Sequence, residues 1–248
     1  MDLQLSGRRA LVTGASSGLG LACAQALAME GATVAIAARS PERLADAAAA
    51  IDSDVIQISA DVSTTAAVEE MVATAENALG GIDILIANAG GPPPGDFAST
   101  DIDAYEPALR LNLLSTVAMC KTVVPAMQAR RWGRVVAVTS ISVREPIAQL
   151  ILSNTARAGV TGFLKTLAHE VASDGVTVNS LQPGLHATDR LHSVYGDDLS
   201  ALAATVPTGT VGEPADFGAL AAFLCSDAAK FITGAAIPVD GGAAHGLQ

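Results

Sequence analysis

A glycine-rich turn near the N-terminus constrains the fold of this chain more than any other feature. Residues 13–20 (TGASSGLG) follow the apolar run 10–12 and open a segment with helical apolar periodicity. A strand, such a turn and a helix start together form a phosphate cradle, because glycines allow close backbone approach and the helix N-terminus presents free N–H groups. The turn residues expected to line the cradle are Gly14, Ser16, Ser17, Gly18, Leu19 and Gly20. Many glycine-rich turns have a steric role only, so the interpretation depends on the rest of the chain.

The length and composition suit one large α/β domain. A chain of 248 residues can bury a full hydrophobic core. Hydrophobic residues make up 50% of it and aromatic residues only 3%, so the core must consist mainly of aliphatic side chains that favour close packing of helices on a sheet. Because no linker, repeat or change in composition interrupts the chain, we expect residues 1–248 to form a single domain.

Charge and cysteine usage restrict the possible partners. The net charge of −11 argues against nucleic acid or an anionic membrane as the main partner. No apolar run approaches the ~18 residues of a membrane span, and the N-terminus lacks a signal-peptide pattern. Cys23, Cys120 and Cys225 lie far apart without metal-ligand spacing, so we expect buried small side chains and no metal site. We therefore predict a soluble cytoplasmic protein whose partner is a small molecule.

Short apolar runs alternate with helical patterns along the whole chain. Strands are predicted at residues 10–12, 33–38, 55–60, 82–87, 134–139, 176–181 and 235–239. Helices are predicted after the glycine turn and at residues 41–50, 64–79, 105–109, 112–130, 153–172 and 214–224. The apolar runs are continuous, which is typical of parallel strands buried on both faces. The order predicts a doubly wound parallel sheet of about seven strands with helices on both faces and a ligand at the carboxyl ends of the strands.

Several local signals mark where elements begin and end. Ser40 and Pro41 predict a helix start, with Ser40 as the N-cap, and Ser63 is expected to cap the next helix. The stiff segment 92–95 (PPPG) predicts a loop. Residues 185–210 show weak periodicity and several turn formers, which suits a flexible lid over the ligand site.

Separated motifs agree in order and spacing with one family. Beyond the glycine turn they are Asp61-Val62, Asn88-Ala89-Gly90, Asn112, Ser140, Pro183-Gly184 and the segment 239–242 (VDGG). The chain resembles the short-chain dehydrogenase/reductase family over essentially its whole length, and in layout it is most similar to the 3-oxoacyl-[acyl-carrier-protein] reductase branch. The resemblance implies a single Rossmann-type domain that binds a nicotinamide dinucleotide. It also implies a homo-oligomer, a tetramer or a dimer, with a heteromer containing an active homologue as the alternative.

The resemblance assigns cofactor contacts to several strand ends. Asp61, followed by Val62, is expected to accept a hydrogen bond from the adenine amino group, and the same carboxylate would also serve as a helix cap. Asn88-Ala89-Gly90 is expected to lie flat beside the adenine ribose. Thr188, shortly after Pro183-Gly184, is expected to touch the carboxamide or the diphosphate of the cofactor.

The end of the second predicted strand indicates which nicotinamide cofactor is bound. A carboxylate at that position hydrogen-bonds the adenosine ribose of NAD and repels a 2′-phosphate. This chain has Ala38 there and Arg39 next to it. An arginine fork suits a phosphate group, so we predict NADP(H); a solvated surface charge is the alternative interpretation of Arg39.

The predicted catalytic centre departs from the family pattern. In the family, a Ser, a Tyr and a Lys four residues after the Tyr carry out the chemistry with the help of an Asn. Ser140 and Asn112 match this pattern, but Ser153 stands thirteen residues after Ser140, where the Tyr is expected, and Arg157 stands at the Lys position. The segment that follows, 160–168 (VTGFLKTLA), matches the family well, so the register holds.

These replacements keep a positive charge but remove the usual proton donor. A phenol titrates near pH ~10 and is brought towards neutrality by a cation, whereas a serine hydroxyl is a poor acid or base without a partner. Arg157 can bind a ribose hydroxyl or an anionic substrate, but it does not give up its proton in turnover. His186 is a candidate substitute because an imidazole has a suitable pKa, with a surface loop histidine as the alternative. Tyr195, His192 and Glu145 are further candidates, for which contacts with solvent, with a neighbouring subunit or within a salt bridge are the alternative interpretation.

Three functions remain open. The first is an NADP(H)-dependent oxidoreductase of a carbonyl/alcohol pair that keeps Ser140 and Asn112 and relays the proton through water, Ser153 or His186. The second is a non-redox lyase or isomerase in the same pocket. The third is a catalytically silent nucleotide-binding protein or partner subunit. The intact glycine turn and Arg39 favour retained nucleotide binding, and the oxidoreductase is the leading hypothesis.

Overall fold

A parallel sheet between two layers of helices forms the framework of the molecule. The computed structural model describes residues 2–246. Within these residues all strands of a seven-stranded sheet are parallel, in the order β3-β2-β1-β4-β5-β6-β7. The strands are β1 (Arg9–Thr13), β2 (Thr33–Ala38), β3 (Ile56–Ser59), β4 (Ile84–Ala87), β5 (Gly133–Val138), β6 (Val176–Pro183) and β7 (Ala236–Val239). The prediction of a doubly wound parallel sheet of about seven strands is confirmed.

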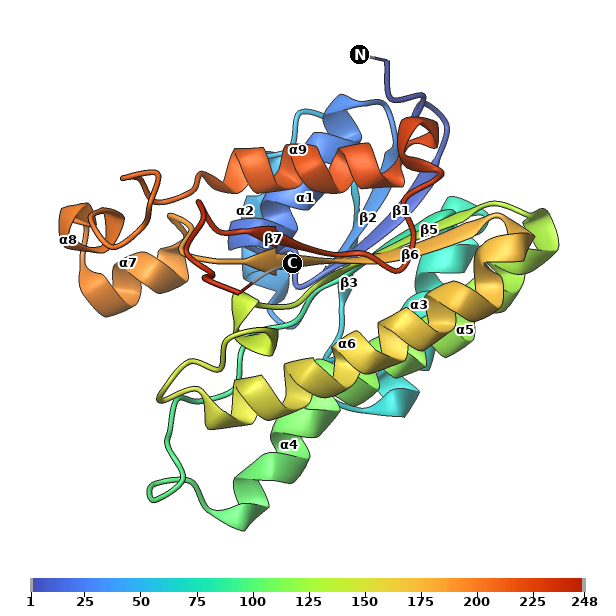
Figure 1. The fold of residues 1–248 in the computed structure, drawn as a ribbon. Helices are drawn as coiled ribbons and strands as arrows, with labels where there is room; N and C mark the ends of the chain where they lie inside the picture. The colour runs from blue at the N-terminus through green and yellow to red at the C-terminus, as the bar shows by residue number, and fades with distance from the viewer. Residues whose placement is uncertain (1, 247–248) are drawn as a thin grey trace.

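Helices cover both faces of this sheet, with α3, α5 and α6 on one face and α1, α2 and α9 on the other (Figure 1). A π-helical turn, Arg110–Leu114, joins α4 to α5, and α7 and α8 follow β6. The helices are α1 (Gly18–Met29), α2 (Pro41–Ala49), α3 (Thr65–Leu79), α4 (Tyr105–Leu109), α5 (Ser115–Arg130), α6 (Ile151–Val171), α7 (Asp189–Tyr195), α8 (Ser200–Ala203) and α9 (Pro214–Cys225). None of the helices within residues 2–246 combines the length and the apolar character needed to cross a bilayer.

The strands contribute alternate side chains to two hydrophobic cores. Leu11 of β1 packs with the layer of α3, α5 and α6, whereas its neighbours Ala10 and Val12 pack with the layer of α1, α2 and α9. All three side chains are fully buried. Because both faces of the sheet are covered, most positions of the central strands are apolar, which explains the continuous apolar runs in the sequence.

The cysteines behave as small core residues. Cys23, Cys120 and Cys225 are buried and unpaired, as the sequence predicts. Burial raises the pKa of the Cys23 and Cys120 thiols to about 12, so both stay protonated at neutral pH. Protonated, inaccessible thiols contribute packing and no nucleophile.

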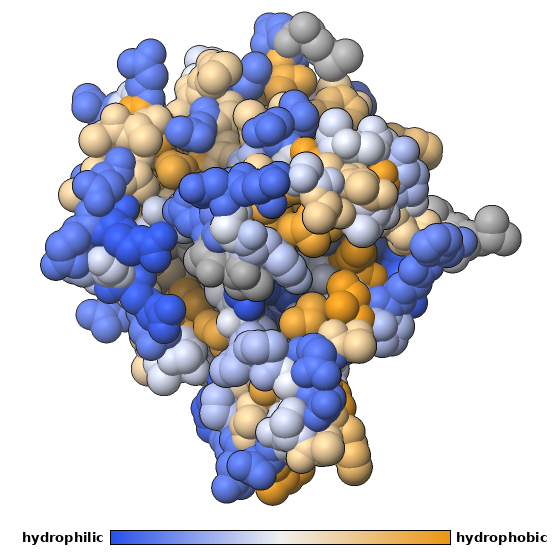
Figure 2. All heavy atoms as spheres, turned by 90° about the vertical axis from the view of Figure 1, so that its left-hand side faces the viewer, coloured by the Kyte–Doolittle hydropathy of each residue, from blue (hydrophilic) through white to orange (hydrophobic). Residues whose placement is uncertain are grey.

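The strand order reverses between β1 and β4, which are neighbours in the sheet. At such a switch point the chain leaves the two strands in opposite directions, and a crevice opens beyond their carboxyl ends. The glycine turn follows β1, and residues 88–90 follow β4, so the topology brings these two motifs together. Figure 2 shows the molecule from the side on which α7 and α8 lie in Figure 1, and the surface there is hollowed between polar and apolar side chains.

The start of α3 differs from the prediction. Ser63 is not its cap. The Ser63 N–H donates to the Asp61 carboxylate at 3.0 Å, so Ser63 belongs to the turn that precedes the helix. The Thr64 hydroxyl caps the helix instead and accepts from the backbone N–H of Ala67. The start of α2 agrees with the prediction, since the Ser40 hydroxyl accepts a hydrogen bond from the helix backbone.

Two further segments have more helix than expected. α6 begins at Ile151, two residues before its predicted start. The predicted lid, residues 185–210, contains α7 and α8. Its movement over a ligand remains a prediction.

Gly218 tests the packing of α9 against α1. A Cβ atom at Gly218 would lie 2.4 Å from the carbonyl oxygen of Ala22, so Gly218→Ala must push the helices apart. We expect the free energy of unfolding, measured by chemical denaturation, to fall by about 1–3 kcal/mol. Gly162→Ala in α6 is the matched control, since no atom outside its own helix backbone lies within 4 Å of that added Cβ, and it should be neutral or stabilising. Equal losses for the two variants would contradict the close helix contact.

Candidate active site

Two adjoining cavities open at the carboxyl end of the sheet. The glycine-turn cavity has a volume of about 650 Å³ and gathers the predicted residues Gly14, Ser16, Ser17, Arg39, Asp61, Val62, Asn88, Ala89 and Gly90. The Ser140 cavity has a volume of about 510 Å³ and gathers the predicted residues Leu19, Ser140, Ser153, Arg157, Pro183, Gly184, His186 and Thr188. Gly91 and Pro92 line both cavities, so the two meet there. The fold thus brings most of the predicted site residues together in one elongated site with two compartments.

The floor of the glycine-turn cavity is packed tightly around two glycines. A Cβ atom at Gly14 would lie 2.7 Å from the side-chain Nδ2 of Asn88 and 2.9 Å from its carbonyl oxygen, and one at Gly20 would lie 2.2 Å from the Gly14 carbonyl oxygen. The Asn88 side chain donates to the Gly14 carbonyl at 3.1 Å. The Thr13 hydroxyl donates to the Asn88 carbonyl and accepts from the Asn88 N–H, which joins the ends of β1 and β4. Glycine at positions 14 and 20 is therefore a steric requirement of this cradle.

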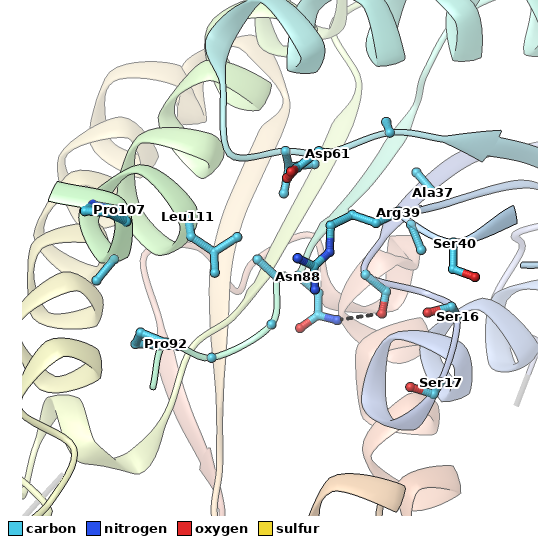
Figure 3. A pocket seen from close by; sticks show the side chains of 18 of the residues that line it. Ser16, Ser17, Ala37, Arg39, Ser40, Asp61, Asn88, Pro92, Pro107 and Leu111 are labelled. Carbon is cyan, nitrogen blue, oxygen red and sulfur yellow. Dashed lines mark hydrogen bonds between the residues drawn. The ribbon is translucent and has the colours of Figure 1, made fainter. Parts of the chain in front are cut away.

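The rim of the same cavity carries two arginines. In Figure 3, Arg39 extends from the end of β2 into the cavity, and Asp61 follows the neighbouring strand β3. Arg43, on the first turn of α2, also lines the cavity together with the Ser40 cap. Arg43 was not predicted from the sequence. The pattern that could have indicated it is a second arginine four residues after Arg39, across a strand-to-helix turn. Two guanidinium groups form a set of donors suited to a phosphate group, whereas the Ser40 hydroxyl already donates to the Glu42 carboxylate at 2.8 Å.

Asn112 lies in the π-helical turn between α4 and α5 and lines neither cavity, but it contacts Gly90 in the wall of the glycine-turn cavity. Its side-chain amide donates to the carbonyl of Gly90 at 2.8 Å. Its Oδ1 is buried and, within the described residues, accepts no hydrogen bond from the protein. A buried acceptor without a donor is costly, and π-helical turns are frequent at functional sites. The arrangement suits a bound water or a ligand donor at Oδ1.

Ser140 and Ser153 face the second cavity from different elements. Ser140 lies two residues after β5, is partly exposed, and its hydroxyl accepts from the Ser142 N–H at 3.1 Å. Its hydroxyl hydrogen is therefore free to rotate towards the cavity. Ser153 lies in the first turn of α6 and is buried.

Arg157 is held at the end of β5, one helical turn after Ser153. Its Nη1 donates to the carbonyl oxygens of Val138 at 2.9 Å and Thr139 at 2.7 Å, immediately before Ser140. The side chain is 9% exposed. Burial, with the nearby charge of Arg190, lowers the pKa of Arg157 to about 10, so the group still carries its charge at pH 7. An arginine has five N–H donors, and the two bonds from Nη1 account for two of them.

His186 packs against α9. Its ring stands edge-on to the ring of Phe217, with centroids 5.3 Å apart, and a Cβ atom at Gly212 would lie 3.0 Å from its Nε2. Nδ1 lies 3.3 Å from the carbonyl oxygen of Gly184. Burial lowers the pKa of His186 from its ordinary value of 6.5. These contacts favour a structural role over the catalytic role that the sequence suggested.

The base of the segment 185–210 packs directly on the cradle. A Cβ atom at Gly18 would lie 3.3 Å from Cγ2 of Thr188, which places Thr188 over the start of α1. A Cβ atom at Gly184 would lie 2.8 Å from Cβ of Asp240, so the two C-terminal motifs also touch. The glycine turn, residues 183–188 and the segment 239–242 therefore form one contact cluster.

The three remaining candidates have different surroundings. Tyr195, on α7, is exposed and lines the Ser140 cavity. His192 lies 3.7 Å from the Asp197 carboxylate, outside both cavities. Glu145 accepts hydrogen bonds from the backbone N–H groups of His245 and Gly246, which holds the C-terminal segment against the loop after β5. Of the three, only Tyr195 reaches the site.

Comparisons with known proteins identify the family. The family model described as Enoyl-(Acyl carrier protein) reductase matches residues 14–244. Nodulation protein G of Azospirillum brasilense is 36% identical over 244 residues, covering 96% of this chain and 98% of the relative. The 3-oxoacyl-[acyl-carrier-protein] reductase FabG of Vibrio harveyi is 35% identical over 240 residues, covering 97% of this chain and 98% of the relative. The chain belongs to the short-chain dehydrogenase/reductase family of oxidoreductases.

Solved structures agree over the full length. L-sorbose reductase from Gluconobacter frateurii, in complex with NADPH and L-sorbose, superposes with a TM-score of 0.92 at 32% identity and covers 100% of both chains. YwfH, an NADPH-dependent reductase involved in bacilysin biosynthesis, superposes with a TM-score of 0.92 at 27% identity, covering 97% of this chain and 99% of its own. These structures confirm the single Rossmann-type domain.

The protonation of His186 provides a test of its packing. We expect NMR titration to show His186 neutral at pH 7, with a midpoint below 6.5. Because the unfolded chain then binds this proton more readily than the folded chain, the contribution of His186 lowers the free energy of unfolding as pH falls below about 6.5. A His186→Gln variant assigns the resonance. A midpoint above 6.5 would contradict the buried position.

Proposed function

We propose that the protein is an NADP(H)-dependent oxidoreductase that interconverts a carbonyl and an alcohol in a centre without the usual Tyr and Lys. One observation carries the proposal: a sterically complete dinucleotide cradle opens directly into a cavity that presents the Ser140 hydroxyl and the Arg157 charge. A chain that retained nucleotide binding alone would not need a hydroxyl aimed into the second cavity.

The residues of the glycine-turn cavity fit NADP(H). The cradle at Gly14 and Gly20 admits only backbone, which suits the close approach of a diphosphate. Arg39 and Arg43 would hold the 2′-phosphate, and β2 carries no acidic side chain to oppose them. Asp61, which follows the neighbouring strand β3, would accept from the adenine amino group, since the hydrogen bond within its turn uses only Oδ1. Bound NADPH would supply a hydride at the junction of the two cavities.

The Ser140 cavity supports polarisation of a carbonyl. When hydride adds to the carbonyl carbon, negative charge develops on the oxygen, and the Ser140 hydroxyl donates a hydrogen bond to it. The fixed charge of Arg157, held at the carbonyls next to Ser140, lowers the energy of the same oxyanion. The proton that completes the alcohol comes from water through the Ser153 hydroxyl, because the His186 ring is engaged with Phe217.

A catalytically silent nucleotide-binding protein is the second candidate. The two hydrogen bonds from Arg157 to backbone carbonyls favour this silent protein, because an arginine with a purely structural role also makes such bonds. A non-redox lyase or isomerase has no specific feature in its favour. The turnover experiment below separates the first two candidates.

We also propose a homo-oligomer in the cytoplasm, a tetramer or a dimer, rather than a heteromer with an active homologue. The large exposed side chains of Phe231, Phe97 and Leu114 support association, and the unpaired cysteines suit a reducing compartment.

Cofactor preference tests the role of the arginine rim. Arg39→Ala and Arg43→Ala should each weaken NADPH binding about tenfold or more, because each removes a charge-assisted hydrogen bond to the 2′-phosphate. NADH binding should stay the same, since NADH lacks this phosphate. Lys230→Ala, which removes an exposed charge elsewhere, is the control and should alter neither affinity. If the wild-type protein binds NADH as tightly as NADPH in fluorescence titrations, the cofactor assignment is wrong.

Turnover tests the role of Ser140. With a panel of carbonyl substrates, Ser140→Ala should lower kcat/KM about 100-fold, the effect of losing one oxyanion donor, while NADPH affinity stays the same. Ser153→Tyr combined with Arg157→Lys serves as the comparison, because it restores the family pattern. If wild-type protein binds NADPH but oxidises it no faster than Ser140→Ala on every substrate, the protein is silent. A gain of activity in the double variant alone would point to the same conclusion.

A further inference from the structure

The charges around the Ser140 cavity contrast with those of the chain as a whole. The chain has 25 acidic and 14 basic side chains other than histidine. Among the described residues that line this cavity, Arg157 and Arg190 are basic and none is Asp or Glu. An acidic protein thus surrounds one of its own cavities with positive charge only. Such a field attracts and selects an anion.

Arg190 brings this charge to the junction of the two compartments. It is the second residue of α7, it is exposed, and a Cβ atom at Gly91 would lie 2.5 Å from its Nη1. Gly91 lines both cavities, so the guanidinium lies where they meet. Asp189, the acidic neighbour in the sequence, faces Arg43 at 3.9 Å on the rim instead.

The two arginines are close enough to repel each other. The positive charge of Arg190 contributes to the lowered pKa of Arg157. Two like charges that act on one another across a cavity are unfavourable, and an anion between them converts the repulsion into two attractions. Because Arg157 is fixed at the end of β5, Arg190 on the short helix α7 is the group that can adjust to a ligand.

Apolar side chains make up much of the remaining cavity wall. Ile147, Leu150, Leu191 and Val206 line it from three segments of the chain. A ligand that fills the cavity therefore combines a polar, anionic end with an apolar body.

We propose that the substrate is an oxo-carboxylate with an apolar body, whose carboxylate pairs with Arg190 while its carbonyl oxygen meets Ser140. The inference rests on the proposed oxidoreductase function. In the reduction, bound NADPH would give up a hydride that forms the new C–H bond, and would itself be oxidised to NADP+. The C=O π electrons move to oxygen, and a proton from water, which leaves hydroxide to the solvent, completes the alcohol. The carboxylate is unchanged, and its charge determines which carbonyl compounds the site accepts.

The experiment compares matched acids and esters. For 2-oxo and 3-oxo acids of increasing chain length and for their methyl esters, we expect kcat/KM to favour the acid at least tenfold. Arg190→Gln should reduce this preference about ten- to hundredfold, mainly through KM, because it removes a charge-assisted pair. Arg110→Gln, an exposed arginine paired with Glu106 outside the Ser140 cavity, is the matched control and should leave the preference unchanged.

Two results would overturn the inference. One is equal use of acid and ester by the wild-type protein. The other is an Arg190→Gln variant that keeps the preference while its NADPH affinity falls, which would assign Arg190 to the cofactor diphosphate.

A binding measurement separates this inference from the proposed function. Calorimetric titration of the NADPH-loaded protein with the same acids should show binding that Arg190→Gln weakens. Binding without turnover would support the anion site and reject the oxidoreductase. Absence of carboxylate binding in a protein that reduces uncharged carbonyls would reject the anion site and leave the oxidoreductase in place.

Discussion

The close approach of the ends of β1 and β4 is the contact on which the site depends. Asn88 donates to the Gly14 carbonyl, and the Thr13 hydroxyl exchanges two hydrogen bonds with the Asn88 backbone. No side chain fits at Gly14 or Gly20 while these bonds exist. The strand order creates the crevice, and this contact sets the shape of its floor. The same cluster supports Thr188, so a segment that lines the second cavity is built on the cradle.

Electrostatics distinguish this centre from the pattern of its family. Arg157 supplies a permanent charge beside Ser140, and Ser153 is a hydroxyl that does not titrate near neutral pH. In the proposed mechanism, this centre would stabilise an oxyanion well and deliver a proton poorly. The rate would then depend on oxyanion stabilisation and on proton supply from water. In the same proposal, the added charge of Arg190 would favour anionic substrates.

The sequence predicts the framework well because both faces of the sheet are buried, so continuous apolar runs and glycine breaks mark the strands directly. Residues whose role depends on backbone geometry, such as Gly14 and Asn88, are equally visible as motifs. The sequence predicts Ser63 as the cap of α3, whereas the structure has Thr64. A shift of one residue decides which hydroxyl meets the free N–H groups of the helix.

Side-chain direction is harder to predict than position along the chain. The orientation of His186 depends on Phe217 in a helix packed later in the chain. Arg43 and Arg190 acquire their roles only when α2 and α7 are placed against the cavities. Such contacts between distant segments have no periodic signal in the sequence.

Deuteride transfer in a single turnover tests the central claim most directly. The NADPH-saturated protein would be mixed with carbonyl compounds, using NADPH labelled with deuterium at the transferred position, and the product analysed by mass spectrometry. The account predicts deuterium on the new alcohol carbon. It also predicts that the pH profile of the transfer rate shows no ionisation of a catalytic tyrosine. Tight NADPH binding with no deuterium transferred to any carbonyl compound would contradict it.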